Sequence, residues 1–145
     1  MNSAQLGRAG AEAIFGVFRN TTGATISAGS AVELEVDAIT DGNAVTAAKS
    51  GSLASLFVGI SDEQMVDDEY GRIQTYGYRQ SAYVSAASAG NAVGTYLIAA
   101  GGILTDATLS AATTSGFTMV TLLETVAAAA GASATANRPV FIRAT

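Results

Sequence analysis

Cysteine and histidine are both absent from this chain of 145 residues. Without cysteine, the chain can form neither disulfides nor thiolate metal sites. Without histidine, it lacks the side chain most used for acid–base chemistry near neutral pH and the commonest ligand for transition metals. A Ser-His-Asp triad is therefore excluded.

Charged residues are also scarce, at 13% of the chain against about 25% in typical globular proteins. Helices usually need long charged side chains on their solvent face, whereas small and β-branched residues suit sheets and tight turns. The length is that of one domain with its own hydrophobic core. We therefore expect an all-β chain: a single-domain antiparallel β-sandwich or small barrel over residues 14–145, with an N-terminal arm over residues 1–13.

Neither the charge nor the hydropathy pattern favours nucleic acid or a membrane as a partner. The net charge is −5, and the six arginines and one lysine are scattered without a basic cluster, so phosphate backbones would mostly be repelled. No segment reaches the ~18–20 consecutive apolar residues of a membrane span. Residues 1–20 lack the basic and apolar regions of a secretory signal, so we expect synthesis in the cytoplasm.

The segment Ala31–Ile39 has the clearest strand pattern. Apolar residues at positions 32, 34, 36 and 38 alternate with acids at 33, 35 and 37, which predicts one buried face and one solvent face. Asp41-Gly42 predicts a hairpin turn. Further strands are predicted over residues 14–19, from 45, and over 56–60, 70–84, 93–99, 117–126 and 138–143.

Two residues have a positional meaning in these strands. The alternation in 70–84 changes phase around Gly77, which predicts a bulge or a close backbone contact there. Pro139, the only proline, is expected at the start of the last strand, where a missing N–H does least harm. We see no repeat of fixed period.

No motif predicts catalysis. The chain lacks a G-x-x-x-x-G-K-[ST] phosphate loop and a G-x-S-x-G elbow. Lys49, the single lysine, follows a polar hairpin, a poor place for a desolvated nucleophile. We therefore expect no catalytic residues, no cofactor and no enzymatic activity, although a carboxylate-only or metal-only enzyme stays open.

An acidic run lies between two predicted strands. Its carboxylates could bind calcium, because hard cations prefer oxygen ligands, but their spacing lacks the alternation of an EF-hand loop. Because charge runs are usually solvated turns, a solvated turn is the favoured explanation of the run, and no metal ligand is assigned. A glycosidase would need two acids facing each other across a cleft, which adjacent acids on one turn do not supply. The run comprises Asp62, Glu63, Asp67, Asp68 and Glu69.

Five sequence blocks are spread over most of the chain, and none of them is a catalytic signature. They are T-G-A-T-I-S-A-G-S-A-V (22–32), F-V-G-I-S-D-E-Q (57–64), G-R-I-Q-T-Y-G (71–77), S-A-G-N-A-V-G (88–94) and R-P-V-F-I-R-A (138–144). Taken in this order, the blocks resemble the head decoration (cement) proteins of tailed bacteriophages.

The resemblance implies a non-enzymatic β protein that binds the outer surface of an assembled phage head. Such proteins commonly sit as trimers at three-fold and quasi-three-fold positions and stabilise the shell against the internal pressure of packaged DNA. The implied partners are the major capsid protein and further copies of the chain. The implied location is the outer face of the virion, after synthesis in the host bacterial cytoplasm.

The residues that touch the shell are expected near the N-terminus. Arms with aromatic and arginine anchors suit protein interfaces, and an arm can add a strand to a neighbouring sheet edge. The expected contact residues, with the capsid or between subunits, are Leu6, Arg8, Phe15, Phe18 and Arg19. The alternative, that the phenylalanines are simply core residues, stays open.

A second possible function is a carbohydrate-binding or adhesion module on a virion or cell surface. Tyrosine is rigid and amphipathic, so several tyrosines could form a surface on which sugars stack. Such a module should show a tyrosine-lined groove with nearby carboxylates. A half-buried sheet face or a subunit interface would explain the same tyrosines, at positions 70, 76, 78, 83 and 96.

Overall fold

The computed structural model describes residues 12–36, 43–47, 56–86, 90–106, 120–127 and 134–143. Strands and turns make up almost all of this part, which confirms the predicted all-β fold. Most strand pairs are antiparallel, but β1–β3 and β5–β7 are parallel. The strands are β1 (Ile14–Asn20), β2 (Ala31–Leu34), β3 (Ala44–Ala47), β4 (Phe57–Ser61), β5 (Tyr70–Ala86), β6 (Tyr96–Ala100), β7 (Ile103–Asp106), β8 (Val120–Leu122) and β9 (Ala134–Arg143).

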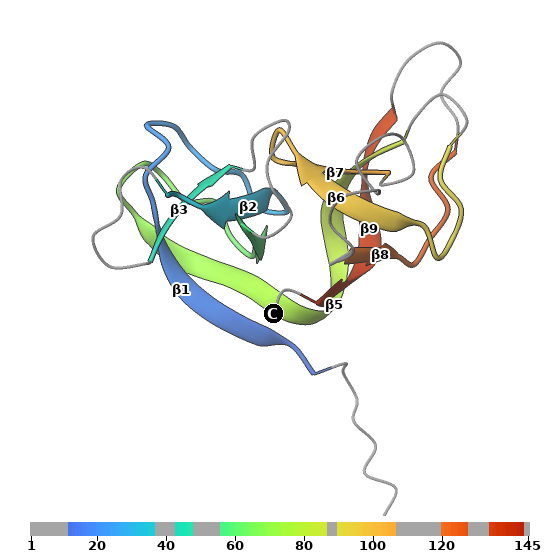
Figure 1. Cartoon of the computed structure of the whole chain (residues 1–145), viewed down its shortest axis with the longest axis horizontal. Helices are drawn as coiled ribbons and strands as arrows, with labels where there is room; N and C mark the ends of the chain where they lie inside the picture. The colour runs from blue at the N-terminus through green and yellow to red at the C-terminus, as the bar shows by residue number, and fades with distance from the viewer. Residues whose placement is uncertain are drawn as a thin grey trace, which may run out of the picture.

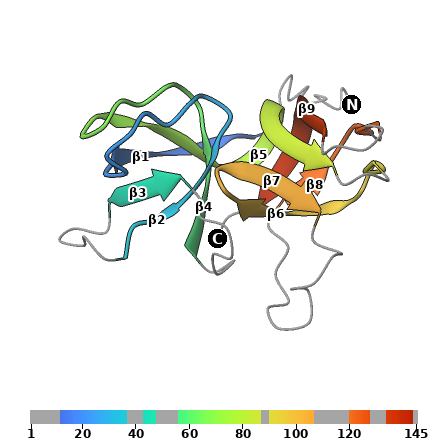
Figure 2. The same ribbon diagram turned by 90° about the horizontal axis from the view of Figure 1, so that it is seen from above.

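The strands form two small barrels that share one strand. In the first barrel the order is β1-β3-β2-β4-β5, and pairing of β1 with β5 closes the ring. In the second barrel the order is β5-β7-β6-β8-β9, and pairing of β5 with β9 closes the ring. The two barrels lie side by side (Figures 1 and 2), with the 17 residues of β5 running through both.

The second barrel repeats the first, strand for strand. The turn before β2 is anchored by Gly29, whose N–H donates to the carbonyl of Ser61 at 2.8 Å. In the turn before β6, the N–H of Gly94 donates to the carbonyl of Leu122 at 2.8 Å. The two glycines have φ values of 87° and 86°, a left-handed conformation that glycine adopts without strain. They therefore occupy equivalent positions.

The strand registers agree as well. Ser61 lies opposite Ile73 in the first barrel, and its counterpart Leu122 lies opposite Val140 in the second. The isolated bridges that lie outside the strands are equivalent in the same way: Ile26 pairs with Met65 in the first barrel, and Asn91 pairs with Val126 in the second. The chain thus contains a duplication that the sequence did not reveal, because its side chains differ while its hydrogen-bonding pattern is kept.

The strand β5 changes from one barrel to the other at a bulge. The register between β5 and β9 shifts between Arg79 and Ala82, so that the two residues Gln80 and Ser81 lie opposite the single residue Pro139. Pro139 lies inside β9, not at the start of the strand as predicted. It lies opposite the bulge, where the N–H that proline lacks is not needed for hydrogen bonding between the strands.

The phase change predicted around Gly77 is confirmed, because the buried side chains of β5 lie at Gly71 and Ile73 before it and at Ala82 and Val84 after it. The register with β1 is also irregular between Gln74 and Tyr76, and the backbone of Gly77 lies close to the carbonyl of Glu12.

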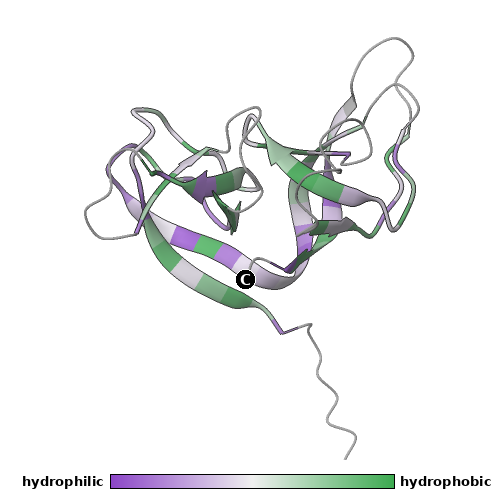
Figure 3. Ribbon diagram, viewed as in Figure 1, coloured by the Kyte–Doolittle hydropathy of each residue, from purple (hydrophilic) through white to green (hydrophobic). Residues whose placement is uncertain are grey.

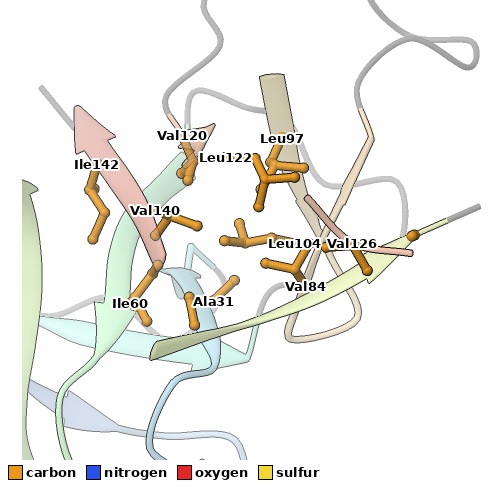
Figure 4. Close-up of a cluster of buried hydrophobic side chains, with 12 residues drawn as sticks. Ala31, Ile60, Val84, Leu97, Leu104, Val120, Leu122, Val126, Val140 and Ile142 are labelled. Atoms are coloured by element: carbon orange, nitrogen blue, oxygen red, sulfur yellow. The ribbon is translucent and has the colours of Figure 1, made fainter. Parts of the chain in front are cut away.

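Each barrel has an apolar core, and the second core reaches into the first barrel. The first cluster comprises Ile26, Val32, Val45, Met65 and Ile73. The second cluster includes Val84, Leu104 and Val140 from the second barrel, together with Ala31 and Ile60 from β2 and β4 (Figure 4). The two barrels therefore pack as one body across the outer side of β2 and β4.

This packing contradicts the solvent face predicted for the segment Ala31–Ile39. Val32 points into the first cluster and Ala31 into the second, so both faces of β2 are covered. Glu33 shares the side of Ala31, is only 4% exposed, and its Oε2 atom accepts no hydrogen bond from the described residues. The strand ends at Leu34, and the predicted turn at 41–42 lies outside the described residues.

Candidate functional site

The outer face of the β1–β5 pair exposes an unusual group of side chains. Val17 lies opposite Arg72 and Arg19 opposite Tyr70, and all four are exposed. Phe15 completes the group on the same side of β1. We call these five residues the ribbon face. Figure 3 shows the apolar character of β1 beside the mixed character of β5.

The arginines of the ribbon face are held in place. Arg72 stacks over the ring of Phe15, 5.4 Å from its centroid, and binds Asp62 at 2.6 Å. Arg19 binds Asp68 at 2.8 Å. Exposed ion pairs contribute little to stability, but they fix the orientation of both guanidinium groups beside the apolar side chains.

The ribbon face lies next to a stretch of β1 that pairs with no described strand on one of its sides. The N–H of Asn20 donates to Glu69 on the β5 side, whereas the N–H of Arg19 donates to Asn43 on the β3 side. Because backbone groups alternate along a strand, those of Phe15 and Val17 also point to the β3 side. There β3 pairs only with Arg19 and Asn20, so no described strand covers Phe15 and Val17, and this side of β1 could accept a further strand.

The contact residues expected from the sequence do not all lie on the ribbon face. Phe15 and Arg19 lie on the ribbon face. Phe18 faces the other way and packs against the first cluster, so it is a core residue, as the alternative held. Leu6 and Arg8, with most of the expected arm, lie outside the described residues.

Three residues of the ribbon face were missed. Val17 could have been found, because it alternates with Phe15 and Arg19 along the same strand. Tyr70 and Arg72 could not, because only the pairing of β1 with β5 brings them beside these residues.

A polar pocket of about 380 Å³ lies at the β5 bulge. Arg79 is its most buried charge, with a side chain 10% exposed. Its guanidinium donates to Asp62 Oδ1 at 3.0 Å and to the carbonyls of Ser61 and Ser81 at 2.8 Å each. The charges of the pocket are therefore already neutralised within the protein. Its lining is Asp62, Gln74, Tyr78, Arg79, Gln80 and Ser81.

The tyrosines do not gather in one groove. Tyr70 belongs to the ribbon face and Tyr78 lines the pocket. Tyr76 packs edge-on against Phe141, whereas Tyr83 is half-buried and Tyr96 is exposed on β6. The expected tyrosine-lined groove is thus reduced to a single tyrosine beside the carboxylate of Asp62.

The acidic run between β4 and β5 is held by the protein itself. Within the described residues, no group of three or more acidic side chains is arranged to hold a metal ion. Each of its carboxylates instead accepts from a nearby donor: Asp62 from Arg72 and Arg79, Glu63 from the Arg72 N–H, Asp67 from the Gly23 N–H, Asp68 from Arg19, and Glu69 from the Val66 N–H.

The described part of the chain has no helix long and apolar enough to cross a membrane. No model of a known protein family matches the chain, and no curated protein matches it either.

Proposed function

We propose that this chain is a non-enzymatic decoration protein that binds the outer surface of a phage head through the ribbon face. It acts as trimers at three-fold and quasi-three-fold positions and stabilises the shell against internal DNA pressure. Its partners are the major capsid protein and further copies of itself. The resemblance of the five sequence blocks suggests the target, and the ribbon face suggests how it is bound.

The composition of the ribbon face is the observation that favours this proposal most. Aromatic residues and arginine are enriched at protein interfaces, whereas lysine and acids are depleted. Phe15, Val17 and Tyr70 are exposed together, beside two arginines with fixed orientation. The adjacent stretch of β1, which no described strand pairs with on the β3 side, could receive a strand from a capsid subunit, a known mode of peptide recognition.

Binding to particles tests the proposal. Heads are purified on a gradient from a source lysate in which the gene for this chain is deleted, and the purified chain is added back. We expect the chain to sediment with the heads at a copy number comparable to that of the shell protein. Imaging of the decorated particles should place it on their outer face. A chain that stays at the top of the gradient with intact heads present would exclude the proposal.

A matched pair of variants links binding to the ribbon face. Val17→Asp places a charge in the face, whereas Val93→Asp places the same charge in a turn of the second barrel. The two valines are equally exposed, at 61% and 60%. We expect Val17→Asp to weaken binding at least about tenfold, a loss of ~1.4 kcal/mol, and Val93→Asp to leave it unchanged.

The pocket at the β5 bulge favours carbohydrate binding as a second function. Tyr78 could stack on a sugar ring, and Gln80 could bond its hydroxyls. Titration of the chain with a glycan library, followed by NMR, would show shifts at these residues. Binding that is lost in Tyr78→Ala but kept in Tyr96→Ala would favour this function, and the absence of shifts would exclude it.

A further inference from the structure

The outer side of the β6–β8 pair presents a face without charge. Tyr96 lies opposite Thr121 across this pair, and Ile98 and Leu123 share their side, because every second residue of a strand points the same way. Leu123 continues the line of β8, since its N–H donates to the carbonyl of Pro139 at 3.0 Å. Tyr96 is 56% exposed and Leu123 38%. We call Tyr96, Ile98, Thr121 and Leu123 the β6–β8 face; the ribbon face lies in the other barrel (Figure 1).

The duplication identifies the counterpart of this face in the first barrel. Ala31 of β2 lies opposite Ile60 of β4, as Tyr96 lies opposite Thr121, and both pairs follow the equivalent turn glycines at the same distance. Ala31 and Ile60 are fully buried. The same surface of the fold is therefore covered in the first barrel and uncovered in the second.

The cover of the first barrel is another barrel of the same fold. Ala31 and Ile60 pack into the second apolar cluster, most of whose members come from the second barrel. Backbone hydrogen bonds also join the barrels: the Ala31 N–H donates to the carbonyl of Gly102, and the Tyr83 N–H donates to the carbonyl of Gly29, each at 3.0 Å. This surface is thus suited to packing against a further copy of the fold.

The β6–β8 face has lost the acids of its covered counterpart. Ile98 occupies the place of Glu33. Leu123 occupies the place of Asp62, since the N–H groups of both donate to equivalent carbonyls of β9 and β5. Thr121 alone is clearly more polar than its counterpart. Surfaces that stay in solvent normally carry more polar and charged residues than buried ones, whereas here the exposed face carries fewer charges, as interaction sites do.

We infer that the β6–β8 face binds a second copy of this chain and forms the contact between copies in the trimers of the proposed function, on which this inference rests. Interfaces between identical subunits are the more apolar kind and are depleted in charged residues. On a chain of net charge −5, an uncharged face is where two copies approach with least repulsion. The ribbon face, with its two arginines, is thereby left free for the shell.

The test measures the oligomeric state of the full chain by analytical ultracentrifugation across a concentration series. Tyr96→Asp places a charge in the face, and Val93→Asp places the same charge in the neighbouring turn. Val93 is 60% exposed, and its counterpart Ala28 stays exposed in the first barrel, so it lies outside the surface that a barrel covers. We expect the unaltered chain and Val93→Asp to sediment as trimers. Tyr96→Asp should raise the concentration needed for assembly at least about tenfold.

The outcomes separate this inference from the proposed function. Trimers that persist unchanged in Tyr96→Asp, or an unaltered chain that is monomeric at every concentration, would overturn the inference, while binding of the chain to heads would still uphold the decoration role. Trimers that Tyr96→Asp dissociates, but that stay at the top of the gradient with intact heads, would exclude the decoration role and leave the contact between copies in place. Far-UV circular dichroism checks folding, and Leu123→Asp replaces Tyr96→Asp if that variant is unfolded.

Discussion

The carboxylate of Asp62 lies 3.0 Å from the guanidinium of Arg79, at the place where β5 leaves the first barrel and enters the second. Asp62 follows β4 of the first barrel, and Arg79 precedes the bulge that begins the second. Arg79 also binds the carbonyls of Ser61 and Ser81. One side chain thus connects the two halves of the duplication.

Arg79→Ala should therefore destabilise the whole chain. It removes one donor from each of the carbonyls of Ser61 and Ser81 and from the carboxylate of Asp62, although Ser61 keeps the Gly29 N–H and Asp62 keeps Arg72. We expect a loss of about 2–3 kcal/mol, because these hydrogen bonds come from a charged and mostly buried group. Urea unfolding followed by circular dichroism measures the change. Arg138→Ala is a control, since this arginine lies 3.9 Å from Glu124, whose side chain is largely exposed, and should cost much less. Equal effects of the two substitutions would contradict this role for Arg79.

Gly77→Ala should displace the start of β1 from β5. A Cβ atom at Gly77 would lie 2.0 Å from the carbonyl oxygen of Glu12, and φ there is +100°. We expect a loss of about 3 kcal/mol or more, because the neighbour in the way is backbone and the conformation is itself strained.

Gly23→Ala is the matched control for this prediction. Gly23 also has a positive φ, +72°, but nothing lies within 4 Å of its added Cβ. Its substitution should cost only about 1 kcal/mol of backbone strain. Thermal unfolding of both variants separates the close contact from the strain, and a Gly77→Ala variant as stable as Gly23→Ala would show that β1 can shift freely.

Replacing Glu33 by isoleucine should stabilise the protein. Glu33 of β2 lies opposite Thr46 of β3. At the equivalent position of the second barrel, Ile98 of β6 lies opposite Thr105 of β7. A buried carboxylate oxygen without a hydrogen bond is unfavourable, so Glu33→Ile should raise the free energy of unfolding by about 1 kcal/mol. Glu33→Gln keeps a polar group there and should give no such gain. Lower stability of Glu33→Ile than of Glu33→Gln would refute the prediction.

Asn20→Ala should weaken the first barrel. The fully buried Asn20 side chain donates to the carbonyls of Ala24 and Met65 and accepts from the N–H and hydroxyl of Thr22. Alanine leaves the Thr22 N–H without its acceptor and removes one of the two donors from each of the carbonyls of Ala24 and Met65, at a cost of about 2–3 kcal/mol. Hydrogen exchange should report faster opening around Thr22 and Met65. Unchanged exchange at these amides would show that water replaces the side chain.

Much of the secondary structure followed from the sequence. Alternation and turn residues are local signals, so strands were found close to their observed places at Ile14–Asn20, Phe57–Ser61 and Tyr96–Ala100. The strand Val120–Leu122 is shorter than predicted, because turns and bridges take over after it. Phe15 and Arg19 could be proposed as surface anchors in the same way.

The duplication could not be predicted from the sequence, because the two segments most alike in sequence do not occupy equivalent positions in the two barrels. The block S-A-G-S-A-V around Gly29 resembles S-A-G-N-A-V around Gly90. In the structure, however, Gly29 corresponds to Gly94, which makes the equivalent hydrogen bond with the equivalent φ. The two barrels therefore share their backbone conformation and hydrogen bonds, whereas most residues at equivalent positions differ.

The sequence by itself determined that the chain forms strands and turns, and that thiol and imidazole chemistry are excluded. Only the tertiary structure decided which strand faces are buried. Alternation shows that a strand has two sides but not what packs against each, so Glu33 was expected in solvent and lies between two barrels. Likewise, the ribbon face exists only because the pairing of β1 with β5 brings Tyr70 and Arg72 beside Val17 and Arg19.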